Sequence, residues 1–139
     1  MNADVDDLEA IRLLKARYFR TMDTKNWAAM RRLFLDDAVI DTTQSGGQVI
    51  GGADEFIAFL RETLADVRTV HHGHMPEITL TSSSTATGIW ALQDVLIWPD
   101  GNRMHGYGHY LDAYFKVDGS WLIGTSTLTR LHMDFTPPG

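Results

Sequence analysis

Three of the six histidines in this chain of 139 residues lie within four positions, in the segment "TVHHGHMPEI" at residues 69–78. Histidine side chains bind metal ions, transfer protons near neutral pH or make structural hydrogen bonds. If this segment is a β-strand, His71 points to one face while His72 and His74 point to the other, because side chains alternate along a strand. The three rings therefore cannot converge on one metal ion, and His71 is considered separately.

His72 and His74 could form a metal site only with acidic side chains from elsewhere in the chain. Their His-x-His spacing is used for zinc and iron, but on a single strand such a pair more often bonds to the backbone or to water. We therefore interpret both as half-buried structural residues and predict no metal site. The chain has no cysteine, which excludes disulfides, thiolate metal ligands and cysteine nucleophiles.

His71 can act as a proton acceptor if a carboxylate bonded to one ring nitrogen leaves the other nitrogen free. Two carboxylates are flanked by apolar residues: Asp23, at the end of the first predicted helix, and Asp94, within "WALQDVLIW" at residues 90–98. Asp94 shares its strand face with the apolar residues Trp90, Leu92, Leu96 and Trp98. A buried carboxylate must be paired or protonated, so Asp94 is a candidate partner. The alternatives are that Asp94 faces solvent and that Asp23 is only a helix cap.

Arg130 and Tyr18 are two further polar residues that could belong to the same site. Arg130, in "LTRLHM" near the C-terminus, is either a surface cation or a group that stabilises a developing oxyanion. Tyr18 lies on the apolar side of the first predicted helix, where it is either a core residue or a phenol that polarises a carbonyl. From the residues alone, the structural role is the commoner one for both.

The elements that would position these residues begin with helices. Residues 8–22 carry apolar side chains every three or four positions, which predicts an amphipathic helix. A shorter helix should follow it, and residues 53–64 predict a third. Candidate N-caps are Asp4 or Asp6 (with Glu9 three residues beyond Asp6) for the first helix and Thr24 or Asn26 for the second. The buried face of the second helix would consist of Trp27, Met30 and Phe34.

The remaining elements are predicted to be strands. A short strand beginning at Val39 and another ending in "VIGG" at residues 49–52 would form a hairpin around Gly46 and Gly47. From Thr69 onward, β-branched and aromatic residues predict four long strands in a meander. These strands are separated by turn sequences at residues 81–84, 99–102 and 117–120.

Helices followed by antiparallel strands predict an α+β fold, in which the sheet covers the helices on one face. A twisted sheet of this length can curl around the three N-terminal helices into a cone whose open end is a pocket. The length of the chain and the absence of an internal linker or repeat predict one domain spanning residues 1–139.

Composition restricts the partners of the chain. The formal net charge is −6 with histidine neutral, and the basic residues are scattered, so we expect no nucleic-acid ligand. The N-terminal segment is acidic and has no apolar centre, and no apolar run is long enough to cross a membrane. We therefore expect a cytoplasmic protein with a small-molecule substrate and no membrane partner.

Several segments together resemble the SnoaL-like domain of the nuclear-transport-factor-2-like superfamily, from about residue 5 to residue 133. They include "LLKARYFRTMDTKNWAAMRRLFLDDAVID", "GGADEFIAFL", "TVHHGHMPEITL", "TATGIWALQD", "GYGHYLDAYFKVDGSW" and "TLTRL". Relatives suggested by this resemblance are scytalone dehydratase, bile-acid 7α-dehydratase and hexachlorocyclohexane dehydrochlorinase. The resemblance implies a cone-shaped α+β barrel with a curved mixed or antiparallel sheet. It also implies that no metal or organic cofactor is used, and it implies a homo-oligomer, with a trimer preferred to a dimer.

The resemblance further implies a shared site, because each polar position of the family has a counterpart in this chain. The Tyr-x4-Asp pair of the family matches Tyr18 and Asp23, and the first histidine of its "HH" pair matches His71. Its strand aspartate matches Asp94, and the arginine of its closing strand matches Arg130. In such a site His71 is the general base, and either Asp23 or Asp94 orients it. Tyr18 would bond the carbonyl or leaving hydroxyl of the substrate, and Arg130 would stabilise negative charge.

The implied activity is a dehydratase-type lyase or isomerase reaction on a small cyclic, largely apolar substrate such as a polyketide, an aromatic compound or a steroid. Aldol cyclisation of a polyketide and a non-catalytic role in ligand binding or protein docking are the alternatives. Candidate pocket walls are Met22, Met75, Trp90, Met104 and Tyr110, each of which could equally be plain core. A further catalytic histidine could be either His105 or His109.

Overall fold

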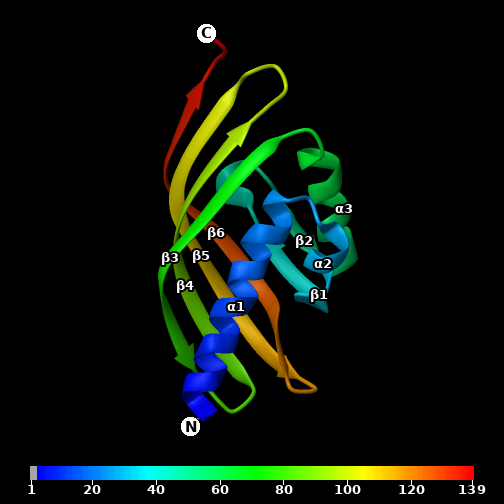
Figure 1. Ribbon diagram of the computed structural model, residues 1–139, viewed down its shortest axis with the longest axis vertical. Helices are drawn as coiled ribbons and strands as arrows, with labels where there is room; N and C mark the ends of the chain where they lie inside the picture. Colours follow the sequence, from blue (N-terminus) through cyan, green and yellow to red (C-terminus); the bar gives the residue numbers. More distant parts are fainter. Residues whose placement is uncertain (1–2) are drawn as a thin grey trace.

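The three helices of the computed structural model, which describes residues 3–139, lie against one face of a curved sheet (Figure 1). Helix α1 (Ala3–Asp23) crosses this face, and α2 (Trp27–Arg31) and α3 (Ala53–Leu64) follow it. Helix α1 begins earlier than predicted, so Asp4 and Asp6 lie in its first turn instead of capping it. Acidic side chains are also favourable there, because the first turn carries the positive end of the helix dipole.

The cap of the second helix is one of the two predicted residues. The Asn26 side chain accepts a hydrogen bond from the main-chain N–H of Ala29 at 3.3 Å. Thr24 instead donates to the carbonyl of Arg20 at 2.7 Å. Because α2 is short, it turns the chain directly from α1 into the sheet.

The first strand, β1 (Phe34–Asp41), starts earlier than predicted. Phe34 was expected on the buried face of the second helix, but it pairs in parallel with Ile123 of the last strand. The register between these two strands shifts between Phe34 and Val39. This irregularity interrupts the alternation of apolar and polar residues, which is the sequence signal for a strand.

A short loop joins β1 to β2 (Val49–Gly51), and the two strands pair antiparallel as the hairpin prediction required. The loop contains a 3₁₀ turn, η1 (Thr43–Ser45), which ends at Gly46. Gly46 has a φ of 77°, a left-handed conformation that glycine adopts without steric cost. The loop therefore turns back compactly and lies beside β6.

The four long strands of the predicted meander are β3 (Arg68–Leu80), β4 (Thr85–Ile97), β5 (Arg103–Val117) and β6 (Ser120–Thr136). They pair antiparallel in sequence order, and β1 joins β6 in parallel, which gives the sheet order β2-β1-β6-β5-β4-β3. The predicted α+β fold with a curved mixed sheet is confirmed. Among the described residues, no helix is long and apolar enough to cross a membrane.

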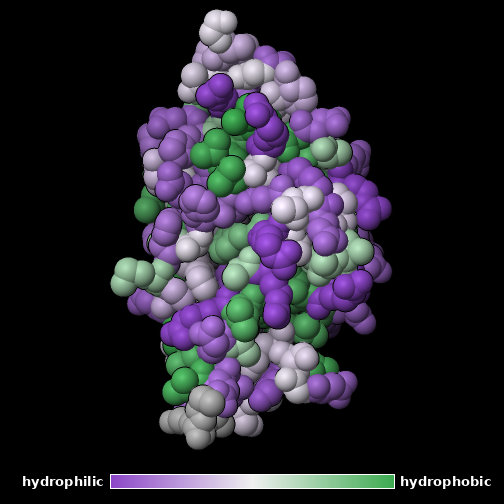
Figure 2. All heavy atoms as spheres, viewed as in Figure 1, coloured by the Kyte–Doolittle hydropathy of each residue, from purple (hydrophilic) through white to green (hydrophobic). Residues whose placement is uncertain are grey.

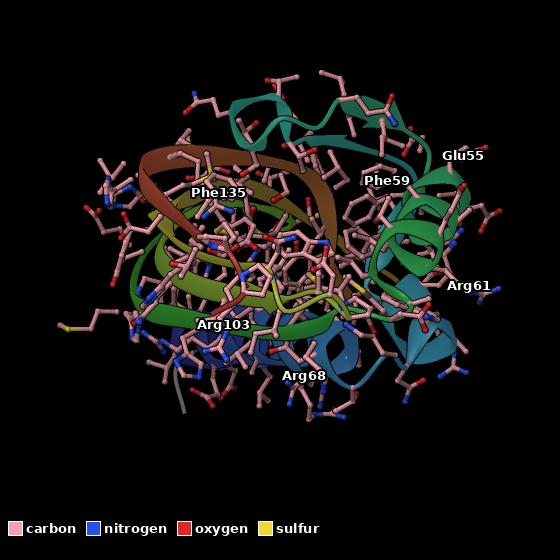
Figure 3. All side chains as sticks on the ribbon, turned by 90° about the horizontal axis from the view of Figure 1, so that it is seen from above. Glu55, Phe59, Arg61, Arg68, Arg103 and Phe135 are labelled. Carbon is pink, nitrogen blue, oxygen red and sulfur yellow. The ribbon has the colours of Figure 1, made fainter. Side chains whose placement is uncertain are left out.

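The core lies between the helices and the concave face of the sheet. Fully buried side chains from every layer meet there, among them Ile11, Met30, Phe56, Tyr114 and Ile123. The exterior seen in Figure 2 is mostly hydrophilic, with one group of hydrophobic side chains near the upper ends of the long strands and others in the lower half of this face. Figure 3 looks down onto that end, where Phe59 of α3 and Phe135 of β6 lie on different sides of the interior.

Candidate active site

A cavity of about 260 Å³ lies between the concave face of the sheet and helices α1 and α3. Most of its wall is apolar and includes Met22, Phe56, Phe59, Leu60, Leu96, Trp98, Met104, Leu128, Met133 and Phe135. Its polar lining includes Tyr18, His71, Asp94, Tyr110, Ser126 and Arg130. An apolar cavity with a few convergent polar groups is the usual form of a small-molecule site.

His71 is held by Asp23, which is the last residue of α1. Nδ1 of His71 lies 2.7 Å from Oδ1 of Asp23, and the main-chain N–H of His71 donates to Oδ2 at 2.8 Å. The hydroxyl of Thr69 also donates to Oδ1 at 2.9 Å, and Lys25 donates to that hydroxyl at 3.1 Å. With Nδ1 donating its proton to the carboxylate, Nε2 carries a lone pair on the cavity side.

Asp94 pairs with Arg130 and does not orient the ring of His71. Two guanidinium nitrogens of Arg130 donate to the two carboxylate oxygens at 2.7 and 2.8 Å. Asp94 Oδ2 lies 3.9 Å from Nε2 of His71, beyond hydrogen-bond length. Both side chains are almost completely buried, at 3% exposure for Asp94 and 7% for Arg130. A carboxylate and a guanidinium that neutralise each other therefore lie beside the free nitrogen of His71.

The loop after β1 fixes the position of Arg130. Nε of Arg130 donates to the hydroxyl of Ser45 at 2.5 Å, and its main-chain N–H donates to Oε1 of Gln44 at 3.0 Å. Sequence reasoning did not find these two residues, because nothing in "TQSGG" indicates that the loop folds back onto β6. Their contacts make the guanidinium a fixed group of the cavity wall.

Gly106 on β5 leaves the space that the Asp94–Arg130 pair occupies. A Cβ at this position would lie 2.4 Å from a guanidinium nitrogen of Arg130 and 2.5 Å from Oδ1 of Asp94. Carbon atoms do not approach nitrogen or oxygen so closely without a bond. Only glycine at position 106 therefore allows the two side chains to meet in this geometry.

The substitution Gly106→Ala is expected to lower the free energy of unfolding by roughly 1–3 kcal/mol, because the new methyl group must displace the ion pair. Gly51→Ala is the matched control, because a Cβ on Gly51 in β2 would meet no atom within 4 Å. Urea denaturation should leave the control within about 0.5 kcal/mol of the wild-type chain. Equal midpoints for the two variants would contradict the tight packing at Gly106.

Tyr18 and Tyr110 form a pair of buried phenols in the cavity wall. A side-chain hydrogen bond joins them, and their ring centroids lie 5.6 Å apart in an edge-to-face arrangement. Burial raises the pKa of Tyr18 above its usual range, and the negative charge of Asp112 raises it further. Burial also raises the pKa of Tyr110, which the nearby Tyr18 raises further. Both hydroxyls therefore keep their protons at neutral pH, and because one donates to the other, one O–H of the pair remains to donate to a ligand.

Below the phenols lies a polar cluster that sequence reasoning missed. Nζ of Lys15 lies 2.8 Å from Oδ2 of Asp112, and both side chains have no exposed surface. The hydroxyls of Ser126 and Tyr114 donate to the same carboxylate at 2.6 and 2.7 Å. Burial lowers the pKa of Lys15, and Asp112 opposes this effect. Asp112 was detectable in principle, since it alternates with Tyr110 and Tyr114 on the inner face of β5.

Three of the five predicted pocket residues, Met22, Met104 and Tyr110, line the cavity. The predictions for Met75 and Trp90 are wrong. Met75 is 93% exposed, because its φ of 32° and the shifted register between His74 and Glu77 turn its side chain outward. Trp90 faces inward but lies outside the cavity, where its indole N–H donates to the hydroxyl of Tyr114 at 2.9 Å.

The outer face of the sheet carries the other histidines of the long strands. His72 and His74 point away from His71, as strand alternation predicts, but both are exposed, not half-buried. Their rings lie 6.2 Å apart. His105 and His109 also lie on this outer face, since they alternate with the buried inner residues of β5. Neither contributes a second histidine to the cavity. Within residues 3–139, no three His, Asp or Glu side chains are grouped as metal ligands.

The curved sheet, the enclosing helices and the cavity with a His–Asp pair define a class of small α+β proteins with an internal pocket. The chain belongs to the SnoaL-like domain family, which matches residues 3–127. Its sequence is 23% identical over 134 residues to "Probable cyclase FGR4" of Gibberella zeae, covering 85% of this chain and 87% of that protein.

Solved structures with the same fold include a candidate scytalone dehydratase from Novosphingobium aromaticivorans. It is 20% identical with a TM-score of 0.87, covering 95% of this chain and 89% of that chain. A hexachlorocyclohexane dehydrochlorinase, LinA type 2, is 18% identical with a TM-score of 0.86, covering 99% and 92% of the two chains. At these identities, the similarity to solved structures establishes the fold.

Proposed function

We propose that the chain is a cofactor-independent enzyme, a lyase or isomerase of the dehydratase type. The observation that carries this proposal is the free Nε2 of His71 at the cavity, with Nδ1 held by Asp23 at 2.7 Å. A histidine held in this way by a carboxylate is the usual arrangement of a general base. The names of the fungal cyclase, the candidate dehydratase and the dehydrochlorinase support the same general class of reaction.

The reaction begins with proton abstraction by His71. Nε2 takes a proton from a carbon next to a carbonyl group, and the electron pair of the broken C–H bond moves toward the carbonyl oxygen. The hydroxyl of Tyr18 donates a hydrogen bond to that oxygen, where negative charge develops. The Asp23 carboxylate then stabilises the imidazolium, as it lies on the opposite side of the ring.

Elimination follows when the enolate reforms its carbonyl and expels a hydroxyl group from the neighbouring carbon. The proton held by His71 is returned to the departing hydroxyl, which leaves as water, so the enzyme ends in its starting protonation state. In this proposal the Asp94–Arg130 pair bonds to this hydroxyl, and Arg130 offsets negative charge on it. The products are one water molecule and an unsaturated carbonyl compound.

The wall of the cavity supports a cyclic, largely apolar substrate. Aromatic and aliphatic side chains from α3, β4 and β6 form most of the surface, as with Phe56, Leu96 and Phe135. The charged groups of the site are already paired with one another, so a charged substrate would find no free counter-ion. A flat ring system with one carbonyl and one hydroxyl group fits both conditions.

Aldol cyclisation is the second candidate, favoured by the name of the fungal relative. The same enolate would attack a second carbonyl carbon of the substrate and form a C–C bond, and the proton from His71 would go to the new alkoxide. Simple ligand binding is less well supported, because a binding pocket has no need for a buried carboxylate and a half-buried one beside a histidine and an arginine.

The test is a screen of hydroxylated ring ketones and linear polyketide mimics, incubated with the full chain in D₂O. Nuclear magnetic resonance detects exchange of the abstracted proton, and mass spectrometry separates loss of water from cyclisation without loss of mass. The variant His71→Gln should lose both exchange and turnover. His72→Gln, on the outer face of the same strand, is the matched control. Full activity of His71→Gln on the best substrate would exclude the proposed mechanism.

A further inference from the structure

Lys15 of α1 has its ammonium group in the interior of the protein. The residue is 0% exposed, and Nζ lies 2.8 Å from Oδ2 of Asp112. Nζ also lies 4.0 Å from the ring centroid of Tyr18 and 3.9 Å from that of Tyr110. The ammonium is therefore in contact with the ring faces of both phenols in the cavity wall.

Stability alone does not account for a charge in this position. Removing an ammonium and a carboxylate from water is costly, and apolar side chains of similar volume commonly stabilise a core as well or better. Lys15 does not line the cavity, so it cannot touch a ligand directly. Both rings that it contacts do line the cavity, and this links the buried charge to the site.

We propose that Lys15 is a positioning residue that fixes and polarises the Tyr18–Tyr110 pair from behind. This inference rests on the proposed function, in which Tyr18 donates a hydrogen bond to the substrate oxygen. A cation over the face of an aromatic ring attracts the π electrons of the ring. The phenol oxygen then carries less electron density, which makes its hydroxyl a stronger hydrogen-bond donor to a developing oxyanion.

Asp112 holds the ammonium in place between the two rings. Its carboxylate is shared among three partners: Lys15, the hydroxyl of Ser126 at 2.6 Å and the hydroxyl of Tyr114 at 2.7 Å. This arrangement anchors the carboxylate to β5 and β6 and fixes where Nζ can lie. The ion pair therefore maintains the geometry. The Asp112 charge acts on Tyr18 in the opposite sense to the cation, and the cation dominates in this proposal because Nζ lies directly against both ring faces.

Two spectroscopic measurements test the proposal without a substrate. The chain has three lysines and four tyrosines, so labelling lysine Nζ with ¹⁵N and tyrosine Cζ with ¹³C gives few signals to assign. The Lys15 signal of the wild-type chain, identified by its loss in Lys15→Met, should be that of a charged ammonium at pH 7. A neutral amine at pH 7 would overturn the proposal.

The tyrosine signals report whether the cation acts on the phenols. The double variant Lys15→Met with Asp112→Asn removes both charges and keeps an acceptor for Ser126, so it should fold even if the single variant does not. It should shift the Cζ signals of both Tyr18 and Tyr110, whereas unchanged signals would contradict polarisation. Lys116→Met is the matched control, since Lys116 pairs with Asp7 at 3.0 Å and lies 6.0 Å from the centroid of a different ring.

Kinetics with a substrate from the screen test the link to Tyr18. The double variant should lower kcat by about tenfold, which corresponds to part of the free energy of a desolvated cation–π contact, with KM little changed. In a Tyr18→Phe background the same substitutions should cost less than about twofold, because the hydroxyl through which Lys15 acts is gone. If the decrease in kcat caused by the double variant were as large in the Tyr18→Phe background as in the wild-type chain, the inference would be overturned. A wild-type chain without turnover would contradict the proposed function, and the two spectra would still decide the role of Lys15.

Discussion

Replacing Asp23 by asparagine is expected to lower kcat by about 10³- to 10⁴-fold, as loss of the orienting carboxylate does in other His–Asp pairs. Asp23 accepts hydrogen bonds from both nitrogens that His71 offers it, Nδ1 at 2.7 Å and the main-chain N–H at 2.8 Å. An asparagine has one oxygen and one NH₂ group, so it can accept only one of these bonds. If its oxygen accepts from the main chain, its NH₂ group faces Nδ1 and selects the tautomer with the proton on Nε2. That tautomer cannot take a proton from a substrate in the cavity.

The control for this substitution is Asp36→Asn, at an exposed carboxylate that pairs with Arg31. It should leave kcat unchanged, and both variants should unfold near the wild-type urea midpoint, because an asparagine fits either site. Retention of more than about one tenth of the wild-type kcat by Asp23→Asn would show that His71 is not the base.

The side of the sheet on which each residue lies could be predicted from the sequence, because β3, β4 and β5 are long and regular. Alternation on β3 separated His71 from His72 and His74, and alternation on β4 placed Asp94 among buried apolar residues. The same rule fails at Met75, where a local irregularity changes the direction of the side chain. Such an irregularity depends on how two strands pair, and one strand's sequence does not determine it.

The choice between Asp23 and Asp94 as the partner of His71 could not be made from the sequence. The choice depends on where α1 ends relative to β3 and on which charged side chain of β6 reaches Asp94 on β4. Both are determined by the tertiary packing of the elements. Lys15 was also hard to place from the sequence. It lies four residues after Ile11 and three before Tyr18, on the buried stripe of α1, although a lysine is typically exposed. Spacing was the better guide than residue type.

Replacing Asp94 by alanine is expected to lower the free energy of unfolding by about 3–5 kcal/mol, because it leaves the buried guanidinium of Arg130 without its anion. The Ser45 hydroxyl would remain as a side-chain partner of Arg130, and a hydroxyl does not balance a positive charge. Urea denaturation followed by tryptophan fluorescence measures the change. Asp36→Ala is the control, because the Asp36 side chain is 95% exposed and an exposed ion pair contributes at most about 1 kcal/mol.

The double variant Asp94→Ala with Arg130→Met separates the cost of an unpaired charge from the cost of lost packing. Each single substitution leaves one buried charge without a partner, whereas the double variant leaves none. The double variant should therefore be more stable than Asp94→Ala alone and should recover most of the loss. Losses that simply add would mean that the two side chains do not interact, which the two bonds of 2.7 and 2.8 Å between them do not allow. Recovery of stability without recovery of activity would assign the pair to the reaction and not to the fold.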